Sequence, residues 1–321
     1  MATHNKIPYA KQALSFADQL ALLERRGLKV ADRPAALDVL ARVSYYRLSA
    51  YWYPFRQSAP QGGKSSDLQP GTSLEAIQSL YEFDRQLRLL VLDALERIEV
   101  ALRTAVTYHL GMRYGAFGHE DPQHFHLQFD HTGWVDRLQT TQLPSFVAHY
   151  QENYQGFPSM PVWMMSELIS LGSLSRLFKG MQNPDKKAIA DPLSLHPKRL
   201  QDWLHVLTYV RNVCAHHSRL WNRDLSIKPM TMNEPEWSAP LLPRRDKLFC
   251  ILLMLRYLLR QQSGNGVAWR DACNALLVPI ATPQTLWVWG QIGRHTRIGR
   301  SQTRPHAKAA QPGSGGCGCK K

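Results

Sequence analysis

The sequence predicts an all-α protein, and three observations lead to that fold class. Apolar residues recur three and four residues apart through several long stretches, as they do on the buried side of helices. No stretch shows the apolar-polar alternation of a half-buried strand. A chain of 321 residues with 44% hydrophobic content can also bury a large core. We therefore expect a helical bundle, either one elaborate domain or a main domain with a small accessory one.

Residues 1–60 are expected to form an N-terminal helical subdomain. Ser15 to Arg26 carries apolar residues at helical spacing, and Asp32 can cap a second helix that we expect to continue into the aromatic run Tyr45 to Phe55. A helix-turn-helix DNA reader would look similar, but a helical hairpin packed on the main bundle is favoured because no row of base-reading side chains follows. Gln57 to Gly71 is rich in Gly, Ser, Pro and Gln and indicates a loop or a domain boundary.

The main helical domain is expected to span residues 72–290. Thr72 to Glu75 has the Thr-x-x-Glu pattern of a capping box and opens a helix that we expect to reach about Leu110. Asp84 and Arg88 lie beside its apolar stripe, one turn apart. An internal ion pair is the favoured role for them, and a place in a catalytic cleft is the alternative.

The next stretch, residues 111–156, is expected to be an irregular, solvent-facing loop with aromatic anchors such as Phe125 and Trp134. Four histidines within it suggest a zinc site, namely His119, His124, His126 and His131. No cysteine accompanies them and their spacing fits no common structural site, so we predict no metal. Further helices are expected over residues 161–172, from Ser173 onward, and over residues 244–261 and 267–277.

One more expected helix, which includes residues 203–223, has the most polar outer side. At about 100° per residue, its apolar stripe holds Trp203, Val206, Leu207, Val210, Val213 and Cys214. The opposite side holds His205, Thr208, Asn212, His216, Arg219 and Arg223. Asn212 and His216 are neighbours one turn apart, Arg211 lies on the flank, and His217 is expected to turn back toward the apolar stripe.

The same helix carries the groups needed to cut RNA. The Arg211 guanidinium can bind phosphate through two hydrogen bonds, and the Asn212 amide can orient a partner. His216 can serve as a base and an acid, because a histidine ordinarily titrates near neutral pH. The solvated side of an ordinary amphipathic helix explains the same spacing. The spacing alone therefore does not distinguish a catalytic site from an ordinary helix surface, and the motifs around it are needed to decide.

Val210 to Arg223 resembles the signature of Abi-like proteins, the AbiD/AbiF abortive-infection family. Other segments resemble that family's motifs in the same order, namely Tyr45 to Phe55, Tyr81 to Arg88, Arg97 to Arg103 and Pro161 to Ser175. The likeness runs from about residue 15 to about residue 262 and leaves out the C-terminal tail.

This resemblance implies a HEPN-like helical bundle, whose hallmark is an Arg and a His separated by four to six residues. Active HEPN proteins are metal-independent endoribonucleases in which two copies of the motif meet, usually across a dimer. Carried over to this chain, Arg211 and His216 are the catalytic pair and Asn212 is the polar residue that follows the Arg. Supporting or RNA-binding roles are expected for Arg219, Arg223, His217, Arg103 and Glu167.

The formal net charge of +14 suits a polyanionic partner, which on charge alone includes RNA, DNA or an acidic membrane surface. Seven Lys or Arg residues and no acid follow Asp271, and residues 299–321 are expected to form a flexible, disordered basic tail. With no signal-peptide core and no apolar run long enough to span a bilayer, the chain is predicted to be cytoplasmic and without a membrane partner. Of its five cysteines, Cys214, Cys250 and Cys273 lie in apolar helical stretches and are expected to be reduced and buried. Cys317 and Cys319 could bind a soft metal or oxidise, but two ligands in a flexible tail make a poor site, so they are assigned to the composition of the tail.

The expected function is therefore a metal-independent endoribonuclease of the abortive-infection or toxin type, which leaves 2′,3′-cyclic phosphate and 5′-hydroxyl ends. Its expected partners are RNA, a second copy that completes the active site, and an antitoxin RNA or protein, and no cofactor is expected. Two alternatives stay open. One is a protein that holds a specific RNA, such as a neighbouring non-coding RNA, without cutting it, and the other is a DNA-binding regulator that uses residues 15–50.

Overall fold

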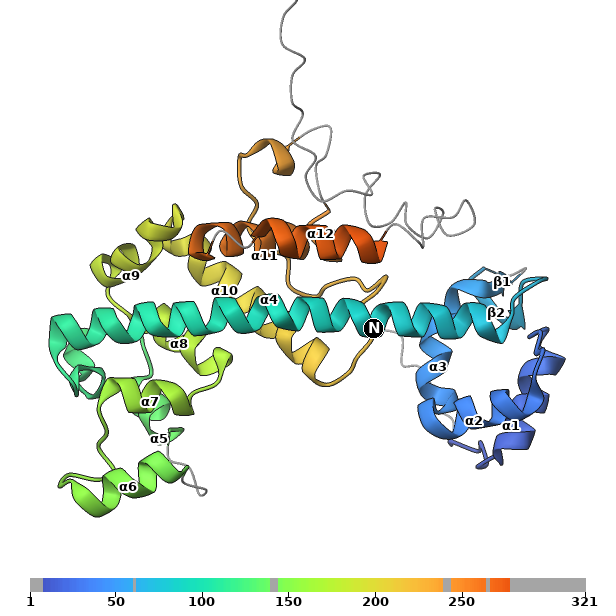
Figure 1. Cartoon of the computed structure of the whole chain (residues 1–321), viewed down its shortest axis with the longest axis horizontal. Helices are drawn as coiled ribbons and strands as arrows, with labels where there is room; N and C mark the ends of the chain where they lie inside the picture. Colours follow the sequence, from blue (N-terminus) through green and yellow to red (C-terminus); the bar gives the residue numbers. More distant parts are fainter. Residues whose placement is uncertain (1–7, 60–61, 139–143, 239–243, 264–265, 278–321) are drawn as a thin grey trace, which may run out of the picture.

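The protein is built around one long helix, α4 (Leu74–Tyr114), which crosses the whole width of the molecule in Figure 1. The computed structural model describes residues 8–59, 62–138, 144–238, 244–263 and 266–277. At about 1.5 Å per residue, the 41 residues of α4 span about 60 Å. The long helix is confirmed, but Ser73 rather than Thr72 caps it, since the Ser73 hydroxyl accepts from the Ala76 amide at 3.2 Å.

Three helices cover the N-terminal end of α4 (Figure 1), namely α1 (Phe16–Arg25), α2 (Arg33–Val43) and α3 (Tyr45–Trp52). The predicted hairpin and its Asp32 cap are confirmed. The predicted continuation of the second helix into the aromatic run is wrong, because Ser44 has φ of 68° and separates α2 from α3. This break turns α3 so that Tyr51 and Trp52 are buried in the core.

A two-stranded antiparallel hairpin follows, made of β1 (Arg56–Ser58) and β2 (Lys64–Leu68). This hairpin is a correction, since a loop or a domain boundary was expected here and no strand was expected in the chain. The fold is otherwise helical in the described residues. Strands of three and five residues are too short to give a periodic signal. The Leu68 amide donates to the Arg26 carbonyl at 2.7 Å, so the hairpin is held by backbone bonds to the N-terminal helices.

Short helices surround the C-terminal end of α4 (Figure 1). They are α5 (His131–Asp136), α6 (Ser145–Asn153), α7 (Val162–Leu168), α8 (Leu171–Gly180) and α9 (Asn183–Ala190). Phe125 and Trp134 are buried as predicted, but His119 and His131 are also buried and do not face solvent. The His131 ring lies 2.8 Å from the His119 carbonyl oxygen, so the ring is used to hold the irregular chain together.

Three further helices complete the described fold, namely α10 (Pro197–Ala215), α11 (Leu248–Ser263) and α12 (Gly266–Leu277). Helix α10 packs against α4 and α8, and α11 and α12 pack against each other and both against α4. Single turns of 3₁₀ helix join these elements, namely η1 (Tyr53–Phe55), η2 (Gly118–Glu120), η3 (Pro122–His124), η4 (Asp191–Leu193) and η5 (Pro235–Trp237).

One hydrophobic core runs from Leu20 in α1 to Leu277 in α12. Within the described ranges, no helix combines the length and the apolar character that crossing a bilayer requires. The expected basic tail over residues 299–321 lies outside the described residues, and the division into parts 1–60 and 72–290 stays a prediction.

Candidate functional site

The candidate site lies where α10 ends. The helix stops at Ala215, so the predicted continuation to Arg223 is wrong. The His217 amide donates to the Cys214 carbonyl and the Ser218 amide donates to the Val213 carbonyl, both at 3.0 Å, and His217 has φ of 55°. These two bonds and the left-handed residue form a complete Schellman motif, which ends the helix and redirects the chain.

This early end changes where the predicted site residues lie. The apolar stripe of α10 is buried and His205, Asn212 and His216 are exposed, as the helical spacing predicts. His217 does not turn toward the core as expected but is exposed, because it lies past the last helical turn. Arg219 and Arg223 belong to the loop after α10 and not to its polar side.

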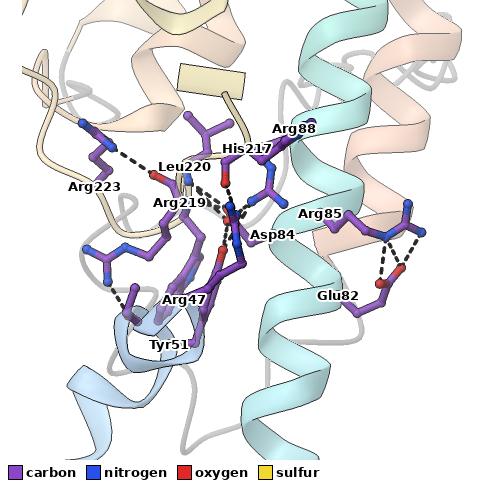
Figure 2. Close-up of polar contacts among 12 residues, drawn as sticks. Arg47, Tyr51, Glu82, Asp84, Arg85, Arg88, His217, Arg219, Leu220 and Arg223 are labelled. Carbon is purple, nitrogen blue, oxygen red and sulfur yellow. Dashed lines mark hydrogen bonds and ion pairs between the residues drawn. The ribbon is translucent and has the colours of Figure 1, made fainter. Parts of the chain in front are cut away.

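Asp84 organises that loop from inside the protein (Figure 2). Its carboxylate is fully buried and forms an ion pair with Arg88, which confirms the favoured structural role of this pair. It also accepts the Tyr51 hydroxyl at 2.6 Å, the Leu220 amide at 3.1 Å and the Trp221 amide at 2.6 Å. One residue of α4 thus joins α3 to the chain that follows the histidines.

Three arginines tie the same loop to its neighbours. Arg47 of α3 donates to the His217 carbonyl at 2.6 Å, and Arg219 donates to the Ala50 carbonyl at 2.7 Å. The Arg223 Nε lies 3.3 Å from the Tyr209 hydroxyl of α10. The position of His216 is therefore fixed by contacts on both sides of the helix end, and Figure 2 shows Arg47, Arg219 and Arg223 arranged around the loop.

An open groove of about 770 Å³ lies between α3 and this loop. We call it the basic groove, because its ionisable lining residues, apart from tyrosines, are Arg47, Arg56, His216, His217, Arg219 and Arg223. No aspartate or glutamate is among the described residues that line it. Burial lowers the pKa of the Arg219 guanidinium, which still carries its charge because an arginine in a protein does not deprotonate.

Arg211 lies in a different place. It lines a second groove of about 610 Å³ together with Glu96, Glu99, Arg103 and Glu167. Five residues along a helix correspond to a rotation of about 140°, which explains why Arg211 and His216 face different grooves of one chain. The fold does not bring the predicted catalytic pair into one groove within a single chain. Asn212 stays with Arg211, whose NH1 lies 3.4 Å from the Asn212 Oδ1.

Arg103 and Glu167 have separate roles in this second groove. Arg103 donates to Glu99 at 2.7 Å and to the Ile169 carbonyl at 2.9 Å, so its fork is used to join α4 to the chain between α7 and α8. Glu167 is exposed on the same wall as Arg211. Within the part of the chain that the structure describes, no hydrogen bond or ion pair joins Glu167 to Arg211.

The cysteines of the described residues lie away from both grooves. Cys214, Cys250 and Cys273 are free and buried, as expected, and burial raises the pKa of each thiol to about 12. Among the described residues, no cluster of three or more His, Cys, Asp or Glu side chains could hold a metal ion. Cys317 and Cys319 lie outside the described residues.

Comparison with known proteins identifies this arrangement. Residues 38–222, which include α3, α4, α10 and the start of the loop after it, match the model of the family described as Abi-like protein. The chain belongs to the Abi-like protein family. No curated protein and no solved structure matches the chain. The Abi-like match holds the Asp84 contacts, the second groove and the basic groove except Arg223, whereas α1, α11 and α12 lie outside it.

The basic groove of this Abi-like protein contains residues that the sequence analysis did not assign to the site. Tyr46 and Arg47 come from α3, Tyr53 from η1 and Arg56 from the start of β1. The aromatic run was interpreted as part of a helix and as a family motif, without a role in the site. The available signal was the mixture of arginines with tyrosines, since a run made only to fill a core would not need Arg47 within it and Arg56 directly after it.

Proposed function

We propose that this Abi-like protein is a metal-independent endoribonuclease that acts in abortive-infection defence against phage. The observation that carries the proposal is the placement of His216. Its imidazole is exposed on the wall of a groove that presents four arginines and no carboxylate among its described lining residues. Such a groove attracts a polyanion, and the imidazole on its wall belongs to a residue type that can both accept and donate a proton.

The chemistry follows from RNA itself, which supplies its own nucleophile. A histidine removes the proton of a 2′-hydroxyl, the 2′-oxygen forms a bond to the adjacent phosphorus, and the bond from phosphorus to the 5′-oxygen breaks. A second, protonated histidine gives its proton to the departing 5′-oxygen. The products are a 2′,3′-cyclic phosphate and a 5′-hydroxyl. Each proton transfer contributes about 10² to 10⁴ in rate.

A complete site requires two copies of the chain under this proposal. One chain supplies one His216, and its Arg211 faces the other groove. An isologous dimer in which the ends of two α10 helices meet would supply two histidines and would let Arg211 reach the phosphate held by the partner. Arg211 then stabilises the charge that develops on the phosphate, and Asn212 orients the Arg211 guanidinium.

A second candidate is supported by the separation of Arg211 from His216. If the two residues never meet, the basic groove still attracts RNA but has no complete cutting machinery. The protein would then hold RNA intact. The two candidates differ in one observable, which is whether RNA strands are broken.

The test is incubation of the purified full chain with pooled cellular RNA in EDTA. We expect the wild type and the control His205→Ala to cleave RNA, since His205 is exposed on α10 but lies outside the basic groove. Cleavage by His216→Ala should be at least 100-fold slower, which is about the lower end of the rate that one proton-transfer group contributes. Equal cleavage by His216→Ala would contradict the proposal. Intact RNA with all three proteins, together with tight binding, would favour the second candidate.

A further inference from the structure

The wall of the basic groove that α3 contributes has two exposed aromatic rings. The Tyr46 side chain is 88% exposed and the Tyr53 side chain is 50% exposed, so neither owes its position to burial in the core. Both line the groove that holds His216. Exposed aromatic rings beside a track of positive charge are the usual means of binding single-stranded nucleic acid, because each ring offers a surface on which a base can stack.

The charges of this groove lack partners of opposite sign. In the described part of the chain, none of the four groove arginines forms an ion pair with a carboxylate. Arg47 and Arg219 donate to neutral backbone carbonyls, which satisfy hydrogen bonds but do not neutralise charge. Arg56 has a buried Nε without a hydrogen-bond partner, and its guanidinium lies 5.6 Å from the centre of the Tyr53 ring. Phosphate groups would balance the charge of these arginines.

We propose that the basic groove binds single-stranded RNA, with bases stacked on Tyr46 and Tyr53 and with the backbone phosphates held by Arg47 and Arg56. A duplex would hide the base surfaces that these rings can use, which is why the strand is single. The proposal rests on the proposed nuclease, because the strand that lies on α3 is then led past His216. It adds that α3, far from α10 in the sequence, forms the substrate-binding wall.

The test measures binding separately from cutting. Fluorescence anisotropy of a labelled, unstructured RNA oligonucleotide is followed in EDTA with full-length His216→Ala protein, which keeps the groove. Adding Tyr46→Ala or Tyr53→Ala should each weaken binding about tenfold, within the range for loss of one stacked base. Affinity falls as salt concentration rises, and adding Arg56→Gln should make the plot of log affinity against log salt concentration less steep by about 0.7. This is the amount for one phosphate contact to a single strand.

Two matched controls lie on other surfaces. Tyr108→Ala removes a ring that is 68% exposed on α4, and Arg176→Gln removes an exposed charge on α8. Neither residue lines the basic groove, and neither variant should change binding. The inference is overturned if Tyr46→Ala and Tyr53→Ala bind RNA as tightly as Tyr108→Ala, or if a duplex RNA that contains the same sequence binds as tightly as the single strand. Because binding is read without cleavage, loss of the nuclease proposal would leave this result intact.

Discussion

At the scale of single residues, Asp84 shows how this protein uses a buried charge. A fully buried carboxylate is costly unless donors surround it, and Asp84 has Arg88, the Tyr51 hydroxyl and two backbone amides. These donors come from α3, α4 and the loop after α10. These contacts therefore fix the loop beside His216 as well as satisfying the buried charges.

Asp84→Asn should destabilise the protein by about 3–5 kcal/mol, because the charge of Arg88 would remain buried without its partner. Asp93→Asn is the matched control, since Asp93 also pairs with an arginine one turn along α4 but at the surface. We expect a cost of about 1 kcal/mol or less for the control. Urea denaturation of both variants checks this, and equal losses would contradict the assigned role of Asp84.

Burial of His119 predicts a dependence of stability on pH. Burial lowers the pKa of His119 from 6.5 to about 4, although Glu120 lies 3.8 Å away and acts in the opposite direction. The unfolded chain binds the proton first, so stability is fully present above pH 6.5 and is lost as the pH falls toward 4. Between pH 7 and pH 5 this histidine should account for a loss of about 2 kcal/mol.

His119→Gln should remove that part of the loss, whereas His126→Gln, whose side chain is exposed, should keep it. Urea denaturation curves recorded at pH 7 and pH 5 for the three proteins measure the difference. The same pH dependence in His119→Gln as in the wild type would show that another group is responsible.

At the scale of elements, the end of α10 decides which residues can act together. The period of the apolar residues predicts the buried stripe of this helix correctly, because burial of a stripe is a property of spacing. Its end was not predicted, because the left-handed position at the helix end is occupied by His217, where glycine is the usual signal. The structure uses backbone bonds and the Asp84 contacts, which join residues more than 130 positions apart, to end the helix there.

A glycine substitution tests this helix end. His217→Gly should stabilise the protein by up to about 1 kcal/mol, because glycine adopts the left-handed conformation at little cost. His205→Gly, an exposed position inside the same helix, should instead destabilise it by about 1 kcal/mol. Thermal unfolding of the two variants gives the signs, and destabilisation of equal size at both positions would contradict the Schellman assignment.

At the scale of the whole molecule, the sequence predicted the helical class, the long helix α4 and the N-terminal hairpin, since each depends on local periodicity and caps. It did not predict the β1–β2 hairpin or the two grooves. The grooves depend on which helix faces are brought together, and α3 meets the loop after α10 only through contacts such as Arg47 to His217, 170 residues apart. Arg211 and His216 were expected to act together, but the rotation of about 140° between them places them on different grooves.

The proposed dimer predicts how inactive chains affect active ones. When wild type and His216→Ala are refolded together in equal amounts, random pairing should lower the activity per wild-type chain to about half, because mixed dimers lack one of the two histidines. Mixing with His205→Ala should leave that activity unchanged. Activity that simply adds in the first mixture would show that each chain cuts alone.

The most direct test of the central claim uses a substrate in which a single ribose, at the mapped cleavage position, carries no 2′-hydroxyl. Cutting by the wild type in EDTA should stop at that position and continue at unmodified ones, since the missing group is the proposed nucleophile. Continued cutting at the modified position would contradict the proposed mechanism, because the attacking oxygen would then come from elsewhere.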